Sequence, residues 1–251
     1  MIMDLLFDYI LYLADNSLIM GHRLSEWTGH GPMLEQDIAI SNIALDLVGQ
    51  SRNFYQYAAA QKENATEDTL AYLRDSREFK NLLITETPNG DWAQTITKLF
   101  FFSRYQYYLY QEMISSADRQ LAAIAEKSLK EVTYHVRWSG DWVIRLGDGT
   151  DESKKRMQKA IDNIWPFTGE MFAPASYEIA LLKDRISVDV SNLKNEWTQK
   201  TRAVFEEATM ALPGNDVWMQ MGGKNGTHSE ELGYILSEMQ FLQRAYPGCE
   251  W

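Results

Sequence analysis

One stretch of the chain constrains the fold more than any other. Within residues 99–110, large aromatic and apolar side chains occupy every side of a helical wheel: Leu99, Phe100, Phe101, Phe102, Tyr105, Tyr107, Tyr108, Leu109 and Tyr110. A helix that is apolar on every side must be buried on every side. We therefore expect residues 91–115 to form either the central helix of a bundle or a helix that meets another chain.

Helical periodicity also dominates the rest of the sequence. We predict helices over residues 4–27, 32–62, 91–115, 119–146, 153–171, 177–182, 191–210 and 229–245, with one more beginning near residue 66. Glycine- and proline-rich turns separate several of them, and residues 212–227 are expected to be irregular. Since no strand pattern, repeat or linker is visible, we predict an all-α fold: a single domain over residues 1–251, built as an antiparallel helical bundle with additional C-terminal helices.

Composition narrows the classes of function. A net charge of −11 argues against nucleic acid and anionic membranes as partners. The single cysteine, Cys249, excludes a disulfide within the chain and a cysteine-based zinc site, and it suits the reducing cytoplasm, where we expect the protein to be. Asp4, Asp8 and Asp15 interrupt the apolar N-terminal stretch, which we interpret as an amphipathic helix and not as a signal or membrane span.

The sequence resembles a carboxylate-rich helical bundle that lacks the ligands of a metal site. A di-iron centre in such a bundle takes a Glu from each of two helices and a Glu-x-x-His from each of two others. Apart from His22 near the end of the first helix, His135 is the one histidine inside a long helical pattern, and Val132 stands three residues before it. This pattern predicts a chain with no metal and no catalytic residue of its own, and so a partner subunit.

Two polar groupings could still carry chemistry. Glu131 and His135 share a helix face and could ligate a metal in principle, but a core-edge histidine bonded to its neighbour is the favoured interpretation. A polar seam runs along the second helix, and it is a solvated face, a buried polar network or a decayed metal site. We favour buried contacts between helices. The seam consists of Asn42, Asp46, Gln50 and Asn53.

The segment from Gly222 to His228 superficially resembles a phosphate loop. It lacks the Walker spacing and follows no strand. As a possible partner or anion loop, Gly222, Gly223 and Lys224 could hold an anion at the start of the last helix. A turn that requires positive φ, or a partner contact, is the favoured interpretation.

Seven stretches, in order along nearly the whole chain, together resemble the C-subunit family of the bacterial phenylacetyl-CoA epoxidase, also called ring-1,2-phenylacetyl-CoA monooxygenase. Each stretch alone is a weak signal, whereas the set is specific. The stretches are Ser25-Glu26-Trp27-Thr28-Gly29-His30, residues 46–53 (DLVGQSRN), Pro88-Asn89-Gly90-Asp91-Trp92, residues 130–135 (KEVTYH), residues 146–151 (LGDGTD), Gly222-Gly223-Lys224 and residues 238–244 (EMQFLQR).

The resemblance implies a ferritin-like bundle that acts as a structural component in phenylacetate catabolism. It implies a homologous A subunit as partner, which carries the di-iron centre and binds the acyl-CoA, together with the other subunits of an oxygen-dependent, NADPH-driven complex. No cofactor is expected in this chain, and a homodimer is possible when the chain is isolated.

Comparison with the catalytic paralogue implies six degenerate metal-site positions. Leu47 and Gln50 fall where one Glu-x-x-His would lie, and Val132 and His135 fall where the second would lie. Glu26 matches a ligand Glu, and Ser103 falls near a further carboxylate. Only two of the six positions, Glu26 and His135, keep a residue of the expected type. The six positions together therefore cannot hold a carboxylate-bridged pair of irons.

Three hypotheses follow. The leading one is a non-catalytic subunit that docks on and stabilises the A subunit. It would present to that subunit the aromatic helix of residues 91–115 or Trp218. The second is a self-sufficient metal-dependent oxidase that uses a non-standard site of Glu26, Glu86, Glu131 and His135. The third is an acyl-CoA-binding module whose Lys224 loop touches the CoA phosphates.

Overall fold

The computed structural model describes residues 2–214 and 216–249, and within them every regular element is a helix. The all-α fold class predicted from periodicity is therefore confirmed. The chain forms two compact units, one built from residues 1–88 and 222–251 and the other from residues 89–221. The prediction of a single domain over residues 1–251 stays a prediction.

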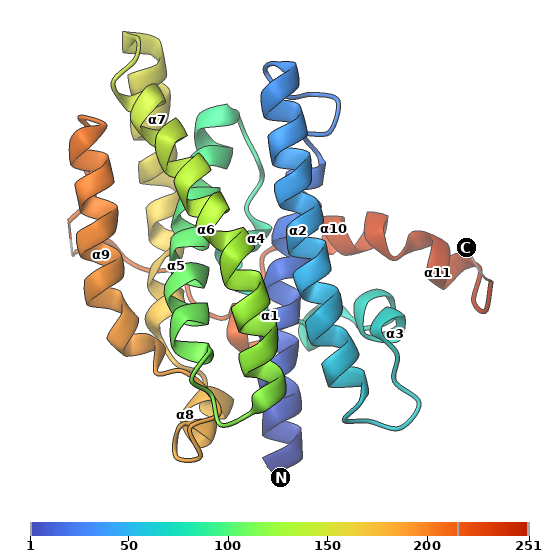
Figure 1. Ribbon diagram of the computed structural model, residues 1–251. Coiled ribbons are helices and arrows are strands. Elements are labelled where there is room, and N and C mark those ends of the chain that lie inside the picture. Colours follow the sequence, from blue (N-terminus) through green and yellow to red (C-terminus); the bar gives the residue numbers. More distant parts are fainter. Residues whose placement is uncertain (1, 215, 250–251) are drawn as a thin grey trace. The chain divides into compact units, whose positions relative to one another are not determined.

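Unit 1 is built on the antiparallel pair of α1 (Ile2–Ser25) and α2 (Leu34–Ala59), which lie side by side in Figure 1. The two backbones approach closely at Gly21, where a Cβ atom would lie 3.2 Å from the Ala44 carbonyl oxygen. The remaining helices of the unit are short: α3 (Glu67–Tyr72), α4 (Leu83–Glu86), α10 (Glu230–Met239) and α11 (Phe241–Ala245).

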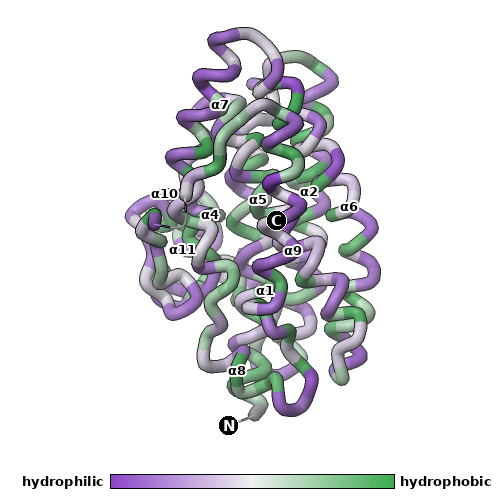
Figure 2. The backbone as a smooth tube through the Cα atoms, turned by 90° about the vertical axis from the view of Figure 1, so that its left-hand side faces the viewer, coloured by the Kyte–Doolittle hydropathy of each residue, from purple (hydrophilic) through white to green (hydrophobic). Residues whose placement is uncertain are grey.

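Unit 2 is built on α5 (Trp92–Met113) and α6 (Arg119–Gly147), flanked by α7 (Asp151–Ile164) and α9 (Val190–Glu207), with the short α8 (Ser176–Leu182) before α9. Asp91 caps α5 by accepting a hydrogen bond from the Gln94 amide at 3.0 Å. Gly147 allows close packing, because a Cβ atom there would lie 2.5 Å from the Ala208 carbonyl oxygen. Figure 2 shows hydrophilic and hydrophobic segments alternating along the helices, as amphipathic helices require.

The aromatic helix that was expected to be central or to meet another chain is α5. Phe100, Phe101 and Phe102 are completely buried, and Phe101 packs against Trp197 and Phe205 of α9 at ring-centroid distances of 5.6 and 5.5 Å. The Trp197 indole N–H donates to the Phe101 carbonyl oxygen at 3.2 Å. These aromatic side chains thus belong to the core of unit 2, whereas Trp218 is 72% exposed.

Two predicted helices are shorter than the periodicity indicated. The helix predicted over residues 153–171 ends at Ile164, and two short 3-10 turns follow it. Pro166 has no amide hydrogen to continue the helical pattern, which explains the end. The helix predicted over residues 229–245 breaks at Gln240, whose buried amide donates to the Ala71 and Arg74 carbonyl oxygens at 3.2 and 3.0 Å.

No helix in the described part of the chain is long and apolar enough to cross a bilayer. The Asp residues noted in the N-terminal stretch lie on α1, and Asp15 is completely buried there.

Candidate functional site

The six positions matched to a metal site divide equally between the units. Glu26, Leu47 and Gln50 belong to unit 1, and Ser103, Val132 and His135 belong to unit 2.

In unit 1, both residues matched to the first Glu-x-x-His are buried. Leu47 is completely buried on α2 and packs against Gly21 of α1, while Gln50 is 1% exposed. Glu26 lies just beyond α1 and is exposed; its carboxylate accepts a hydrogen bond from Arg23 Nη1 at 2.8 Å. Arg23 also pairs with Glu231 at 2.9 Å. Glu26 therefore forms part of an ion-pair network that joins the end of α1 to α10.

In unit 2, Val132 and His135 are completely buried on α6, and Ser103 is 1% exposed on α5. The Ser103 hydroxyl is buried with no hydrogen-bond partner in the described part of the chain. Ser139 donates to the His135 backbone oxygen at 2.6 Å. Glu131 is half-buried, one turn before His135.

These residues do not fit a carboxylate-bridged pair of irons. Leu47 and Val132 are buried aliphatic side chains and supply no donor atom where the ligand pattern requires oxygen or nitrogen. Within residues 2–214 and 216–249, no group of three or more His, Cys, Asp and Glu side chains could hold a metal ion.

The polar seam on α2 differs from the favoured interpretation. Asn42 is exposed, Asp46 and Asn53 are half-buried, and Gln50 alone of the four is buried. The prediction of buried contacts between helices was therefore wrong for Asn42. Sequence spacing identified the shared face, but it could not say how far the face turns toward solvent.

The Gly222–His228 segment is a tight turn packed into unit 1. Gly222 and Gly226 have φ angles of +138° and +78°, and a Cβ atom on Gly223 would lie 2.2 Å from the Asn81 carbonyl oxygen. Lys224 is 2% exposed, and its ammonium lies 4.8 Å from the centre of the Tyr12 ring. This geometry supports the interpretation as a turn that requires positive φ.

The end of that turn carries a polar cluster that sequence analysis did not assemble. Glu86 of α4 is completely buried, and its carboxylate accepts four hydrogen bonds. The donors are Asn81 Nδ2 at 2.9 Å, His228 Nδ1 at 2.5 Å, the Ser229 amide at 2.9 Å and the Ser229 hydroxyl at 2.6 Å. The cluster fixes the start of α10 on α4.

The hydrogen-bond partners of His228 determine its protonation state. Nδ1 faces the Glu86 carboxylate, and Nε2 faces the Phe79 carbonyl oxygen at 2.8 Å. Since both partners accept, both ring nitrogens donate, so the ring is an imidazolium. Burial lowers the pKa of His228, but the hydrogen bond and charge of Glu86 outweigh burial and raise this pKa above its ordinary value of 6.5.

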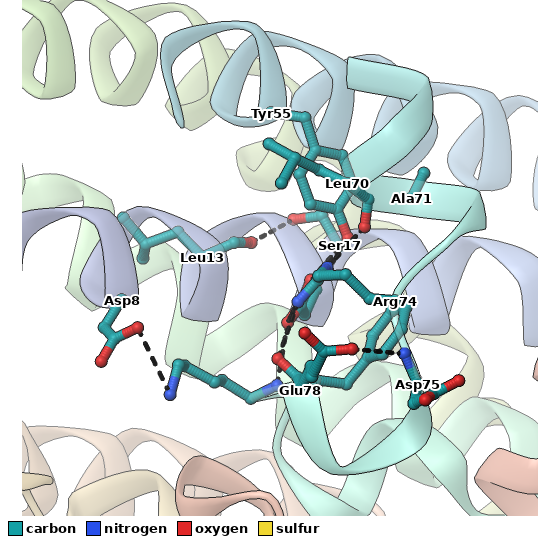
Figure 3. Close-up of polar contacts among 12 residues, drawn as sticks. Asp8, Leu13, Ser17, Tyr55, Leu70, Ala71, Arg74, Asp75 and Glu78 are labelled. Atoms are coloured by element: carbon teal, nitrogen blue, oxygen red, sulfur yellow. Dashed lines mark hydrogen bonds and ion pairs between the residues drawn. The ribbon is translucent and has the colours of Figure 1, made fainter. Parts of the chain in front are cut away.

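A second cluster in unit 1 surrounds Asp15, and Figure 3 labels two of its members, Tyr55 and Arg74. Arg74, just beyond α3, donates to both Asp15 oxygens, while the Tyr55 hydroxyl donates at 2.5 Å and the Lys80 amide at 2.8 Å. Burial disfavours the charge of Arg74, but the attraction of Asp15 outweighs it and raises the pKa of Arg74. Burial, with the charge of Asp15, also raises the pKa of Tyr55.

A carboxylate directly after an apolar run was the signal that could have found this cluster. Asp15 follows a run of buried side chains on α1. A sequence cannot name its partner, however, because Arg74 is 59 residues away. Each of the two carboxylates already accepts four hydrogen bonds, so a metal ion would have to displace the donors that neutralise it.

Two comparisons with known proteins agree with each other. The family model of the phenylacetic acid catabolic protein matches residues 3–251. The chain is also similar to the C subunit of the 1,2-phenylacetyl-CoA epoxidase of Escherichia coli strain K12, with 46% identity over 249 residues, covering 99% of this chain and 100% of that protein.

Proposed function

Because the chain belongs to the phenylacetic acid catabolic protein family, we propose that it is a non-catalytic structural subunit of a multicomponent phenylacetyl-CoA epoxidase in phenylacetate catabolism. In this role it adopts a ferritin-like bundle, and it pairs with and stabilises a homologous catalytic subunit that holds the iron pair and the acyl-CoA. The complex works in the cytoplasm and receives its reducing equivalents through other subunits.

One observation carries the non-catalytic part of the proposal. Leu47 and Val132, at two positions where the paralogue comparison places ligands, are completely buried aliphatic side chains. Placing a carboxylate at such a position without a compensating charge is costly, so these sites are built for packing. The buried carboxylates Asp15 and Glu86, by contrast, are neutralised by protein donors.

An exposed apolar stripe on α2 supports the pairing. Leu34, Ile38, Leu45 and Val48 are 71%, 52%, 68% and 39% exposed. Their spacing places them along one face of the helix. Exposed apolar side chains gathered on one helix face mark an interaction site, and an obligate interface commonly buries more than roughly 2,000 Å². We therefore assign this stripe to the contact with the catalytic subunit.

Metal content separates the proposed role from a self-sufficient oxidase. The chain is purified alone and also with the subunits encoded beside it, and iron and phenylacetyl-CoA epoxidation are measured in both preparations. We expect iron and activity in the complex and neither in the isolated chain. Tightly bound, redox-active iron at two atoms per isolated chain would overturn the non-catalytic role.

Substitution on α2 tests the pairing surface. Leu45→Asp should abolish co-purification with the catalytic subunit, because it places a charge in an apolar contact. Ile179→Asp on α8, which also replaces an exposed apolar residue, is the matched control. Both variants should leave the free energy of unfolding within about 0.5 kcal/mol of the parent. Normal co-purification of Leu45→Asp would exclude this stripe as the contact.

A further inference from the structure

Unit 2 contains a hollow of about 430 Å³ whose walls are α5, α6 and α9. Arg104, Tyr107 and Tyr108 line it from α5, Arg137 from α6, and Glu196 and Lys200 from α9. Arg104 and Tyr108 of α5 are four positions apart, as are Glu196 and Lys200 of α9, so each pair shares one helix face. The volume is within the range of small-molecule sites.

The hollow gathers positive charge in a chain whose net charge is −11. Three cations line it, and Glu196 is the single carboxylate among its lining residues. Within residues 2–214 and 216–249, Arg104, Arg137 and Lys200 have no ion-pair partner. This contrasts with Arg23 and Arg74 of unit 1, each of which is paired with a carboxylate.

Arg104 is held in position before any ligand arrives. It is half-buried, and its guanidinium lies 4.9 Å from the centre of the Phe100 ring. It also hydrogen-bonds to Tyr108, whose pKa is raised by burial and lowered by this arginine, with burial the larger effect. The Nε atom of Arg104 is buried with no hydrogen-bond partner in the described part of the chain. A fixed guanidinium loses little conformational entropy when it binds an oxyanion.

From this geometry we propose that the hollow binds the phosphate or diphosphate group of a small metabolite. Arginine presents a planar fork of donors that matches phosphate oxygens, and lysine adds a mobile point charge. Two tyrosines, Tyr107 and Tyr108, also line the hollow, with ring centroids 5.3 Å apart at 82°. A concave site walled by three helices suits a small ligand better than a flat protein surface. The proposal is independent of the subunit's proposed role.

Titration with inorganic pyrophosphate tests the site. Isothermal calorimetry is carried out on the full chain at low ionic strength in a phosphate-free buffer. We expect saturable binding by the parent that weakens as salt is added. Arg137→Gln and Lys200→Gln should each weaken binding roughly tenfold, because each removes one charge-assisted contact. Both side chains are exposed, so the variants should fold normally.

Lys194→Gln is the matched control, since Lys194 is an exposed lysine of α9 that does not line the hollow. It should bind pyrophosphate as the parent does. Absence of saturable binding by the parent overturns the proposal, and so does equal weakening by Lys194→Gln. If Arg137→Gln impairs co-purification with another subunit while the parent binds no pyrophosphate, the cations serve a protein contact and the proposal is wrong.

Discussion

Two groups of charged side chains, one in each unit, contrast with each other. In unit 1, the buried carboxylates Asp15 and Glu86 are each surrounded by donors from segments far apart in the sequence. In unit 2, three cations surround a hollow and have no carboxylate partner in the described part of the chain. The first arrangement is closed to solvent, whereas the second is open to it.

This difference separates charges that hold the fold from charges that are available for binding. A buried ion pair that loses one partner leaves an uncompensated charge in a low dielectric, so the protein depends on it. When an exposed cation is removed, the protein loses only weak, screened electrostatic interactions. We therefore expect the closed clusters to dominate stability and the open hollow to leave stability almost unchanged.

The largest effect is expected at Arg74. Arg74→Met leaves Asp15, which is completely buried, without its cation, and should reduce the free energy of unfolding by about 3–5 kcal/mol. Urea denaturation followed by circular dichroism measures the loss. Arg52→Met is the control, because Arg52 forms an exposed pair with Glu67 and should cost no more than about 1 kcal/mol. Equal losses of unfolding free energy in the two variants would show that the buried pair is no more important for stability than the exposed pair.

A smaller, pH-dependent effect is expected at His228. His228→Gln removes a charged hydrogen bond to Glu86 and should cost about 1.5–3 kcal/mol at about pH 6. The folded pKa of His228 is raised, so its contribution is fully present below the unfolded pKa of 6.5 and is lost as pH rises through the folded pKa. The difference between variant and parent should therefore shrink as pH rises through the folded pKa of His228. A difference in unfolding free energy that grows with pH would contradict the assignment of His228 as an imidazolium.

The smallest effect on stability is expected in the hollow. Arg137→Gln and Lys200→Gln should leave the free energy of unfolding within about 0.5 kcal/mol of the parent, because exposed cations without partners contribute little. Urea denaturation at low salt measures this. A loss of unfolding free energy as large as that of His228→Gln would show that these cations support the fold, and would contradict the difference proposed between the two groups of charges.

Much of the fold followed from local pattern. The aromatic stretch predicted a buried helix, and α5 is buried along the same residues except at Tyr107. The predicted helix over residues 119–146 agrees with α6 (Arg119–Gly147) to within one residue. The end was predictable because Gly147-Asp148-Gly149 cannot continue a helix easily. Where prediction failed, a single residue decided the outcome: Pro166 ended one helix early, and the buried contacts of Gln240 broke another.

Residue type and local periodicity were enough to establish that the chain is all-α, where its long helices lie, and that residues 47 and 132 carry no ligand atom. These properties depend on side-chain chemistry and on repeats of three or four residues. Helix packing, by contrast, decided which charges meet: Asp15 with Arg74, Glu86 with His228, and three cations around one hollow. The reason is physical, since these partners come together across separations as large as 142 residues, which no local pattern encodes.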